Sequence, residues 1–175
     1  IHRNKLHNRE GALKWLTLPI QKCPQETLIK DVIFTLEAQN EWNNRLETFN
    51  HFTENDDNDL WERIGTLEST LVDYLEVTLK SIGTMLDLST TWIRSSELNI
   101  PYNIKGEQRI IEIVKRLNGK RYINAPGGRA LYNPNTFSQH ELELSFLPPF
   151  EGSMVSILER ILTEDIETII PVSYT

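Results

Sequence analysis

The chain has 175 residues, 39% of them hydrophobic and 25% charged, which is typical of a folded globular protein and excludes a disordered or fibrous one. Its 18 basic and 25 acidic residues give a formal net charge of −7. Because nucleic-acid binding relies on basic surfaces, we expect no nucleic-acid partner. A chain of this length can bury a core without disulfides or structural metals.

The chain carries one cysteine, Cys23, which cannot close an intramolecular disulfide, so the framework of a small secreted protein is excluded. No apolar run approaches the length of about 18 residues that spans a bilayer. The opening residues 1–5 are too polar for the core of a signal peptide. We therefore expect a cytoplasmic protein without a membrane span.

The N-terminal part of the chain favours strands. Strand-forming residues cluster between 13 and 20 and stop at Pro19-Ile20, and residues 8–11, which end at Gly11, suit the turn of a hairpin. Residues 27–34 contain another β-branched run, whose type the pattern leaves open.

Between Trp42 and Leu88 the apolar residues follow a helical period. The acidic run 54–59 divides this region and favours the N-terminus of the second helix. Gly65 and Gly83 are expected to weaken that helix without breaking it. This region is the predicted long central helical part of the domain.

The second half of the chain mixes short strands with helices and shows no regular alternation of the two. That pattern predicts an α+β fold in a single domain, with short strands, a long central helical region and two further helices. The expected elements are strands at 90–96, 121–123 and 142–147, a helix at 107–117 ended by Asn118-Gly119, a helix at 153–162 capped by Ser153, and a short helical turn at 163–170.

The sequence lacks the motifs that would identify a cofactor or a metal. The glycine patterns of dinucleotide-binding, P-loop and α/β-hydrolase proteins do not occur. The histidines stand singly and form no HExxH pair; they are His2, His7, His51 and His140. We therefore expect no cofactor and no metal site.

Each of three polar stretches has two interpretations. The Gly127-Gly128-Arg129 segment could present N–H groups and a guanidinium to an anion or a sugar hydroxyl, or it could be a tight turn. Gln108 and Arg109 could line a cleft with a preceding strand end at Ser95, or could belong to an ordinary helix start. The basic opening up to Arg9 suits either an anionic ligand or a solvated edge strand whose charges discourage pairing.

Six short sequence motifs follow one another along nearly the whole chain, in the order typical of one protein family. They are His2-Arg3-Asn4-Lys5, Trp15-Leu16-Thr17-Leu18-Pro19-Ile20, Arg94-Ser95-Ser96-Glu97-Leu98, Gly106-Glu107-Gln108-Arg109-Ile110-Ile111, Tyr122-Ile123-Asn124-Ala125-Pro126-Gly127-Gly128-Arg129-Ala130-Leu131-Tyr132 and Ser156-Ile157-Leu158. In these six motifs the chain resembles the WbqC-like family. The resemblance implies one WbqC-like domain over residues 1–175 that lacks the N-terminal segment usual before the position of His2.

The resemblance also implies a bacterial cytoplasmic protein linked to surface polysaccharide, such as the O-antigen of lipopolysaccharide. From this pathway context we expect a sugar-modifying transferase that moves an acyl or aminoacyl group onto a nucleotide-linked amino sugar. The alternative is a noncatalytic module that binds or scaffolds a glycosyltransferase or a glycan precursor. The expected partners are a nucleotide-sugar or related precursor and other enzymes of polysaccharide assembly.

In such a transferase we expect His2 to carry the acid–base chemistry, because imidazole titrates near neutral pH. Gly127, Gly128 and Arg129 would bind a phosphate or an oxyanion. The sugar and diphosphate groups would be bound by Arg3, Asn4, Ser95, Gln108, Arg109, Asn124 and Tyr132. The family pattern often carries a cysteine near Val114 and an aspartate near Glu159, and neither is present in this chain.

Overall fold

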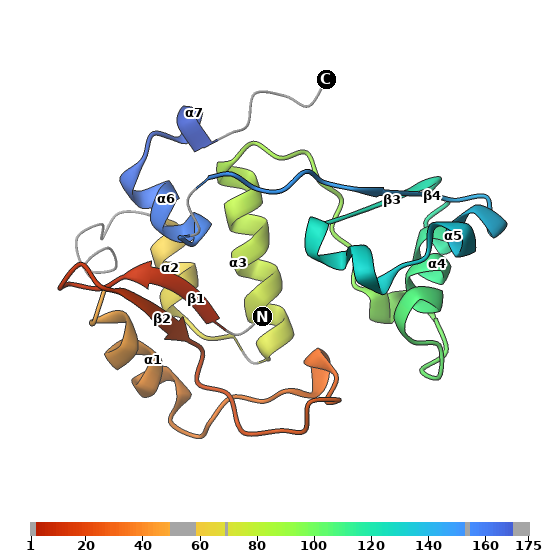
Figure 1. Ribbon diagram of the computed structural model, residues 1–175. Coiled ribbons are helices and arrows are strands. Elements are labelled where there is room, and N and C mark those ends of the chain that lie inside the picture. Colours follow the sequence, from red (N-terminus) through yellow and green to blue (C-terminus); the bar gives the residue numbers. More distant parts are fainter. Residues whose placement is uncertain (1–2, 50–58, 69, 153–154, 170–175) are drawn as a thin grey trace. The chain divides into compact units, whose positions relative to one another are not determined.

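The computed structural model describes residues 3–49, 59–68, 70–152 and 155–169 (Figure 1). The chain divides into two compact units: unit 1 comprises residues 1–90 and 153–175, and unit 2 comprises residues 91–152. Each unit combines helices with one two-stranded sheet, which confirms the predicted α+β class. That residues 1–175 form a single domain stays a prediction.

Unit 1 begins with the predicted hairpin. Strand β1 (Arg3–His7) pairs antiparallel with β2 (Leu13–Thr17), in a register that places Lys5 opposite Trp15. The turn closes with hydrogen bonds from the N–H groups of Asn8 to the Ala12 carbonyl and of Gly11 to the Asn8 carbonyl, both 2.9 Å. Gly11 has a φ of +74°, a conformation that glycine adopts at little cost.

The predicted central helical region is three separate helices: α1 (Ala38–Leu46), α2 (Asp59–Gly65) and α3 (Leu71–Met85). The expectation that Gly65 would leave its helix unbroken is wrong, because α2 ends there and α3 begins after Thr70, whose hydroxyl accepts the Asp73 N–H at 3.1 Å. Gly83, by contrast, lies inside α3. Residues 27–34, whose type the sequence pattern left undecided, contain a short 3₁₀ helix, η1 (Ile29–Asp31). Phe34 also forms an isolated β-bridge with Ile20.

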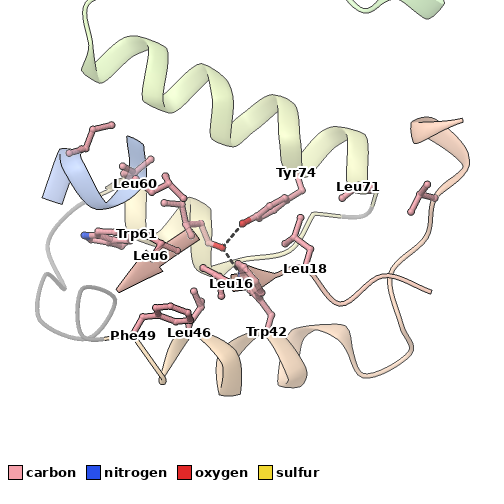
Figure 2. Close-up of a cluster of buried hydrophobic side chains, with 14 of the residues drawn as sticks. Leu6, Leu16, Leu18, Trp42, Leu46, Phe49, Leu60, Trp61, Leu71 and Tyr74 are labelled. Atoms are coloured by element: carbon pink, nitrogen blue, oxygen red, sulfur yellow. Dashed lines mark hydrogen bonds between the residues drawn. The ribbon is translucent and has the colours of Figure 1, made fainter. Parts of the chain in front are cut away.

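The core of unit 1 is a cluster of buried hydrophobic side chains (Figure 2) from the hairpin and from helices α1, α2, α3 and α6 (Ile157–Thr163). The Trp42 indole N–H of α1 and the Tyr74 hydroxyl of α3 both donate to the Ile64 carbonyl of α2, at 2.7 and 3.0 Å. Ile64 lies in the last turn of α2, where helical carbonyls have no helical partner. Leu6 and Leu16 of the hairpin are buried in the same cluster.

Helix α6 (Ile157–Thr163) closes the free edge of β1. The Ser156 N–H donates to the Lys5 carbonyl at 2.9 Å, and the Glu159 carboxylate accepts the His7 backbone N–H at 2.7 Å. The hydroxyl of Ser156 caps α6 by accepting the Leu158 N–H. The predicted cap, Ser153, lies outside the described residues. The expected short turn follows as α7 (Ile166–Ile169).

Unit 2 contains a parallel pair of strands, β3 (Arg121–Asn124) and β4 (Glu143–Phe146), joined by the 3₁₀ helix η4 (Pro126–Leu131) and the helix α5 (Pro134–Gln139). Helix α4 (Gly106–Arg116) precedes β3. It ends as predicted, with Asn118 at a φ of +54° and the Gly119 N–H bonded to the Val114 carbonyl at 2.8 Å. The buried core residues of the unit are Ile111, Val114, Phe137 and Leu142.

The strand predicted at 90–96 is wrong. Residues 90–94 form no strand, and Ser95 opens the 3₁₀ helix η3 (Ser95–Leu98). Trp92 and Ile93, the residues that favoured a strand, are 40% and 48% exposed. A β-forming run becomes a strand only where a partner strand accepts its backbone hydrogen bonds. No helix in the described part of the chain is long and apolar enough to cross a membrane.

The Tyr74 hydroxyl generates a prediction for stability. Burial raises the pKa of Tyr74 above its ordinary value near 10, so the folded state favours the neutral phenol. Stability from this group is complete below pH 10 and is lost as the pH rises beyond it, because the unfolded chain deprotonates first. We expect Tyr74→Phe to lower the free energy of unfolding by about 0.5–1.5 kcal/mol at pH 7. In urea denaturation from pH 8 to 11, the variant's stability should fall less steeply with pH than that of the wild type; equal slopes would contradict the assignment.

Candidate functional site

The residues predicted to bind the ligand fall into both units. Arg3 and Asn4 lie on β1 of unit 1. His2, the predicted catalytic residue, lies outside the described residues. All the others belong to unit 2: Ser95, Gln108, Arg109, Asn124, Gly127, Gly128, Arg129 and Tyr132.

Asn124, Gly128 and Tyr132 come together where β3 ends and η4 begins. The Asn124 side-chain oxygen accepts the Ala125 N–H at 2.8 Å, and the Gly128 N–H donates to the Ala125 carbonyl at 3.0 Å. A Cβ on Gly128 would overlap the Asn124 amide and come within 3.1 Å of its Cγ, whereas one on Gly127 would meet no atom within 4 Å. The amide of Gly128 is therefore engaged within the turn, and its missing side chain makes room for Asn124.

Three aromatic side chains, Tyr122, Tyr132 and Phe137, pack together next to this turn. The Tyr132 ring lies edge-on to Tyr122 and Phe137, with centroids 5.6 and 6.0 Å away. Burial, followed by the hydrogen bond and charge of Tyr132, raises the pKa of Tyr122 to about 12, so this phenol stays neutral at physiological pH. The exposed Arg129 guanidinium lies 4.9 Å from the centroid of the Phe146 ring, a cation–π contact within the unit.

Arg109 lies in the first turn of α4. Two residues before it, Glu107 binds the start of α5, since its carboxylate accepts the Asn133 N–H at 2.5 Å. On an ideal helix Arg109 lies roughly 200° around the axis from Glu107, so the two side chains point to different sides of α4. That Arg109 shares a site with Gly127 and Gly128 stays a prediction. Helix η3, with Ser95, contacts α4 through Arg116, whose guanidinium donates to the Leu98 and Asn99 carbonyls.

In unit 1, Arg3 belongs to an exposed face of the hairpin. Side chains alternate along a strand, so the register places Arg3, Lys5, His7, Leu13, Trp15 and Thr17 on the face opposite the buried Leu6 and Leu16; we call this the hairpin face. Trp15 is 52% exposed, with the Arg3 guanidinium 4.5 Å and the Lys5 ammonium 5.6 Å from its ring centroid. Asn4 has the opposite orientation, and its side-chain oxygen accepts the Ser156 hydroxyl at 3.2 Å.

Two hollows adjoin the hairpin along α1. The first, of about 370 Å³, is lined by Lys14, Trp15 and Asn44 among others. The second, of about 780 Å³, follows the segment after β2 and includes Gln21 and the exposed Cys23. Both are lined by Glu41 and Arg45. We call the pair the Trp15 groove.

Glu41 and Arg45 are held in place by each other and by neighbouring segments. The Arg45 guanidinium donates to the Glu41 carboxylate at 2.9 Å and to the Thr17 carbonyl of β2 at 2.6 Å. The other Glu41 oxygen accepts the Thr35 hydroxyl at 2.8 Å. A guanidinium and a carboxylate fixed in this way recognise hydroxyl and phosphate groups without first having to be ordered.

The sequence interpretation missed the groove. Its signals were present: Glu41 and Arg45 have the i,i+4 spacing of a helical ion pair, and Arg3 and Lys5 alternate on one strand face. Neither pattern indicates which segment lies opposite. Among the described residues, no group of three or more His, Cys, Asp or Glu side chains is arranged to hold a metal ion.

Comparison with known proteins gives one match. The model of the WbqC-like protein family matches residues 1–152. No curated protein and no solved structure matches the chain. The matched residues include β1, β2, α1 and all of unit 2, and they end before α6.

The turn at Gly127 and Gly128 generates a prediction with a matched control. We expect Gly128→Ala to lower the free energy of unfolding by about 1–3 kcal/mol, because the new methyl group displaces the Asn124 amide from its bond to Ala125. Gly127→Ala, one residue away in open space, should leave it nearly unchanged. Urea denaturation of both variants checks this. Equal losses would show that the packing around Gly128 is not the cause.

Proposed function

The chain belongs to the WbqC-like protein family, and from this premise we propose that it binds a nucleotide-linked sugar, a precursor of bacterial surface polysaccharide, at the hairpin face and the Trp15 groove. The proposal includes a cytoplasmic location, where such precursors are made. The observation that carries it is the half-exposed Trp15 ring with the Arg3 and Lys5 cations over it.

The chemistry of this face suits an anionic ligand with a flat or apolar surface. An exposed indole offers a stacking surface for a nucleobase or a sugar ring. The guanidinium and ammonium groups beside it supply charge-assisted hydrogen bonds to phosphate. They form a basic patch on a chain whose net charge is −7, so the patch is not a product of overall composition.

The Trp15 groove offers space for the rest of such a ligand. Its two hollows, of about 370 and 780 Å³, are in the range of about 300–1,000 Å³ that small-molecule sites occupy. The fixed Glu41 carboxylate accepts hydrogen bonds from sugar hydroxyls, and Arg45 donates them. The binding residues expected in unit 2, above all Arg129 and Tyr132, stay a separate prediction.

The reaction that we propose is transfer of an acyl or aminoacyl group onto an amino sugar. The second candidate is a noncatalytic module that holds a glycosyltransferase or a glycan precursor. It is favoured by exposed apolar side chains on unit 2, such as Ile123 at 52%, Leu131 at 70% and Phe150 at 63%. Transfer activity of the purified protein separates the two.

The binding proposal is tested with Trp15→Ala. UDP-glucosamine, which carries a free amine, a sugar and a diphosphate, serves as the probe in isothermal calorimetry. We expect Trp15→Ala to raise the Kd at least tenfold, about 1.4 kcal/mol, through loss of stacking and of the cation–π array. The melting temperature should change little, because half of the Trp15 side chain already faces solvent.

Two further variants control this experiment. Trp92→Ala removes another exposed tryptophan, 40% accessible and in unit 2, and should leave the Kd unchanged. Arg109→Ala tests the site implied by the family resemblance, which predicts loss of binding at an unchanged melting temperature. If Arg109→Ala abolishes binding and Trp15→Ala does not, the ligand binds to unit 2 and the Trp15 site is refuted.

A further inference from the structure

We propose that His7 and Glu159 form an acid–base pair, in which His7 takes the proton from the amine of the acceptor sugar during acyl transfer. The inference rests on the proposed function and adds to it the residue that handles the proton. It begins from a contact between a strand and a helix that lie 152 residues apart in the chain.

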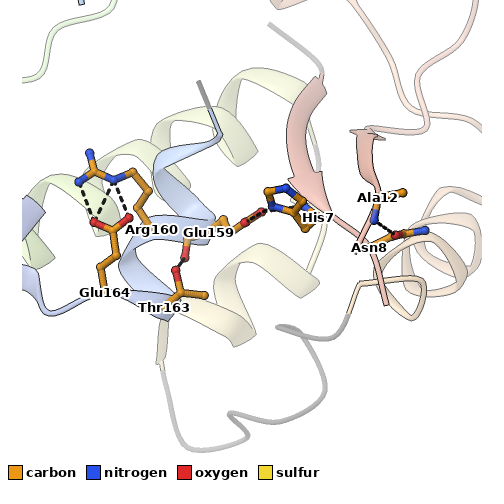
Figure 3. Close-up of polar contacts among 7 residues, drawn as sticks. All are labelled: His7, Asn8, Ala12, Glu159, Arg160, Thr163 and Glu164. Atoms are coloured by element: carbon orange, nitrogen blue, oxygen red, sulfur yellow. Dashed lines mark hydrogen bonds and ion pairs between the residues drawn. The ribbon is translucent and has the colours of Figure 1, made fainter. Parts of the chain in front are cut away.

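The Glu159 carboxylate is buried and bound to His7 twice (Figure 3). One carboxylate oxygen lies 2.5 Å from His7 Nδ1, and the other accepts the His7 backbone N–H at 2.7 Å. The side chain of Glu159 is only 10% exposed, whereas that of His7 is 43% exposed. The carboxylate is therefore the inner member of the pair, and the imidazole reaches solvent.

This geometry selects one form of the imidazole. An ionised carboxylate only accepts hydrogen bonds, so the ring nitrogen that faces it carries the proton. In the neutral ring Nε2 is then left with its lone pair, ready to accept a proton. A buried carboxylate that orients an imidazole in this way also stabilises the imidazolium that forms during proton transfer.

The pair lies beside the proposed ligand site. His7 follows Lys5 on the hairpin face, and residues two apart on a strand are roughly 7 Å from each other. Lys5 in turn is opposite Trp15. His7 is therefore the next side chain after Lys5 on the face that carries Trp15, where we propose that the sugar stacks.

Docking of α6 does not require the imidazole. The helix is already attached through the Ser156 N–H to Lys5 and through the carboxylate to the His7 backbone. The other charged pair of this segment joins Arg160 to Glu164, four residues later, by hydrogen bonds of 2.7 to 3.1 Å, and these bonds do not link α6 to the hairpin. His140, the other described histidine, contacts Lys115 on an exposed surface and has no buried carboxylate behind it.

The proposed acyl transfer needs no cofactor beyond the thioester that donates the group. The sugar amine attacks the carbonyl carbon of an acyl or aminoacyl thioester and forms a C–N bond, while His7 Nε2 takes one amine proton. The C–S bond breaks with its electron pair on sulfur, and the imidazolium returns the proton to that thiolate. The products are an amide and a free thiol, and the protein is regenerated.

His7→Asn and Glu159→Gln are the test variants. Asparagine places an amide N–H where His7 has Nδ1, so the contact with Glu159 is kept while the proton acceptor is lost. Glutamine keeps the shape of Glu159 and, by donating to Nδ1, moves the ring proton to Nε2. Each variant should lower the transfer rate from a thioester such as acetyl or glycyl coenzyme A to UDP-glucosamine at least 100-fold, within the range of general acid–base catalysis. For Glu159→Gln, whose side chain lies behind the imidazole, the Kd for UDP-glucosamine should stay within twofold of the wild type.

Ser156→Ala is the matched structural control, because it weakens the attachment of α6 to β1 without touching the pair. It should lower the melting temperature and leave the transfer rate within twofold. The inference is overturned if His7→Asn transfers at the wild-type rate, if Ser156→Ala loses transfer to the same extent, or if wild-type protein that binds UDP-glucosamine transfers no group from any thioester. In the last case the binding site stands and only the catalytic role fails; absence of binding refutes the proposed function itself.

Discussion

The arrangement of unit 1 depends on the carbonyl of Ile64. It lies at the C-terminal end of α2, where the helix supplies no partner, and it is buried where water does not reach. Trp42 and Tyr74 satisfy it together and thereby join α1 and α3 to α2. The same α1 that points Trp42 inward carries Glu41 and Arg45 on the groove side. Burial of one polar atom thus positions the side chains proposed to meet the ligand.

The hydrogen bonds at the two edges of the hairpin also have both a structural and a functional side. A two-stranded sheet is only marginally stable by itself and leaves polar backbone groups exposed on both sides. In unit 1, β2 is closed by the Arg45 guanidinium at Thr17, and β1 is closed by Ser156 and Glu159. Two of these closing residues, Arg45 and Glu159, also belong to the proposed site, whereas Ser156 only attaches α6 to the hairpin. Structural and functional contacts are therefore shared by the same side chains, and for this reason the experiments pair each functional variant with a structural control.

Local chemistry explains which elements were predictable. The hairpin follows from Gly11 and the strand-forming run after it, and the end of α4 follows from Asn118 and Gly119, because each depends on residues a few positions apart. The segment 90–96 has equally good strand chemistry, yet no partner strand reaches it. For Gly128 the sequence left either an anion-binding glycine or a tight turn, and only packing reveals that its missing Cβ makes room for the Asn124 amide.

The sequence by itself determined the α+β class, most of the helices and strands, and the family. The reason is that hydrophobic periodicity, turn residues and short sequence motifs each depend on residues that are close together in the chain. Tertiary structure alone decided which polar groups meet. Glu159 reaches His7 across 152 residues, and Arg45 reaches Thr17 across 28. Such pairings depend on how hydrophobic faces pack and on where each buried polar atom finds its partner, and neither is encoded at any fixed spacing.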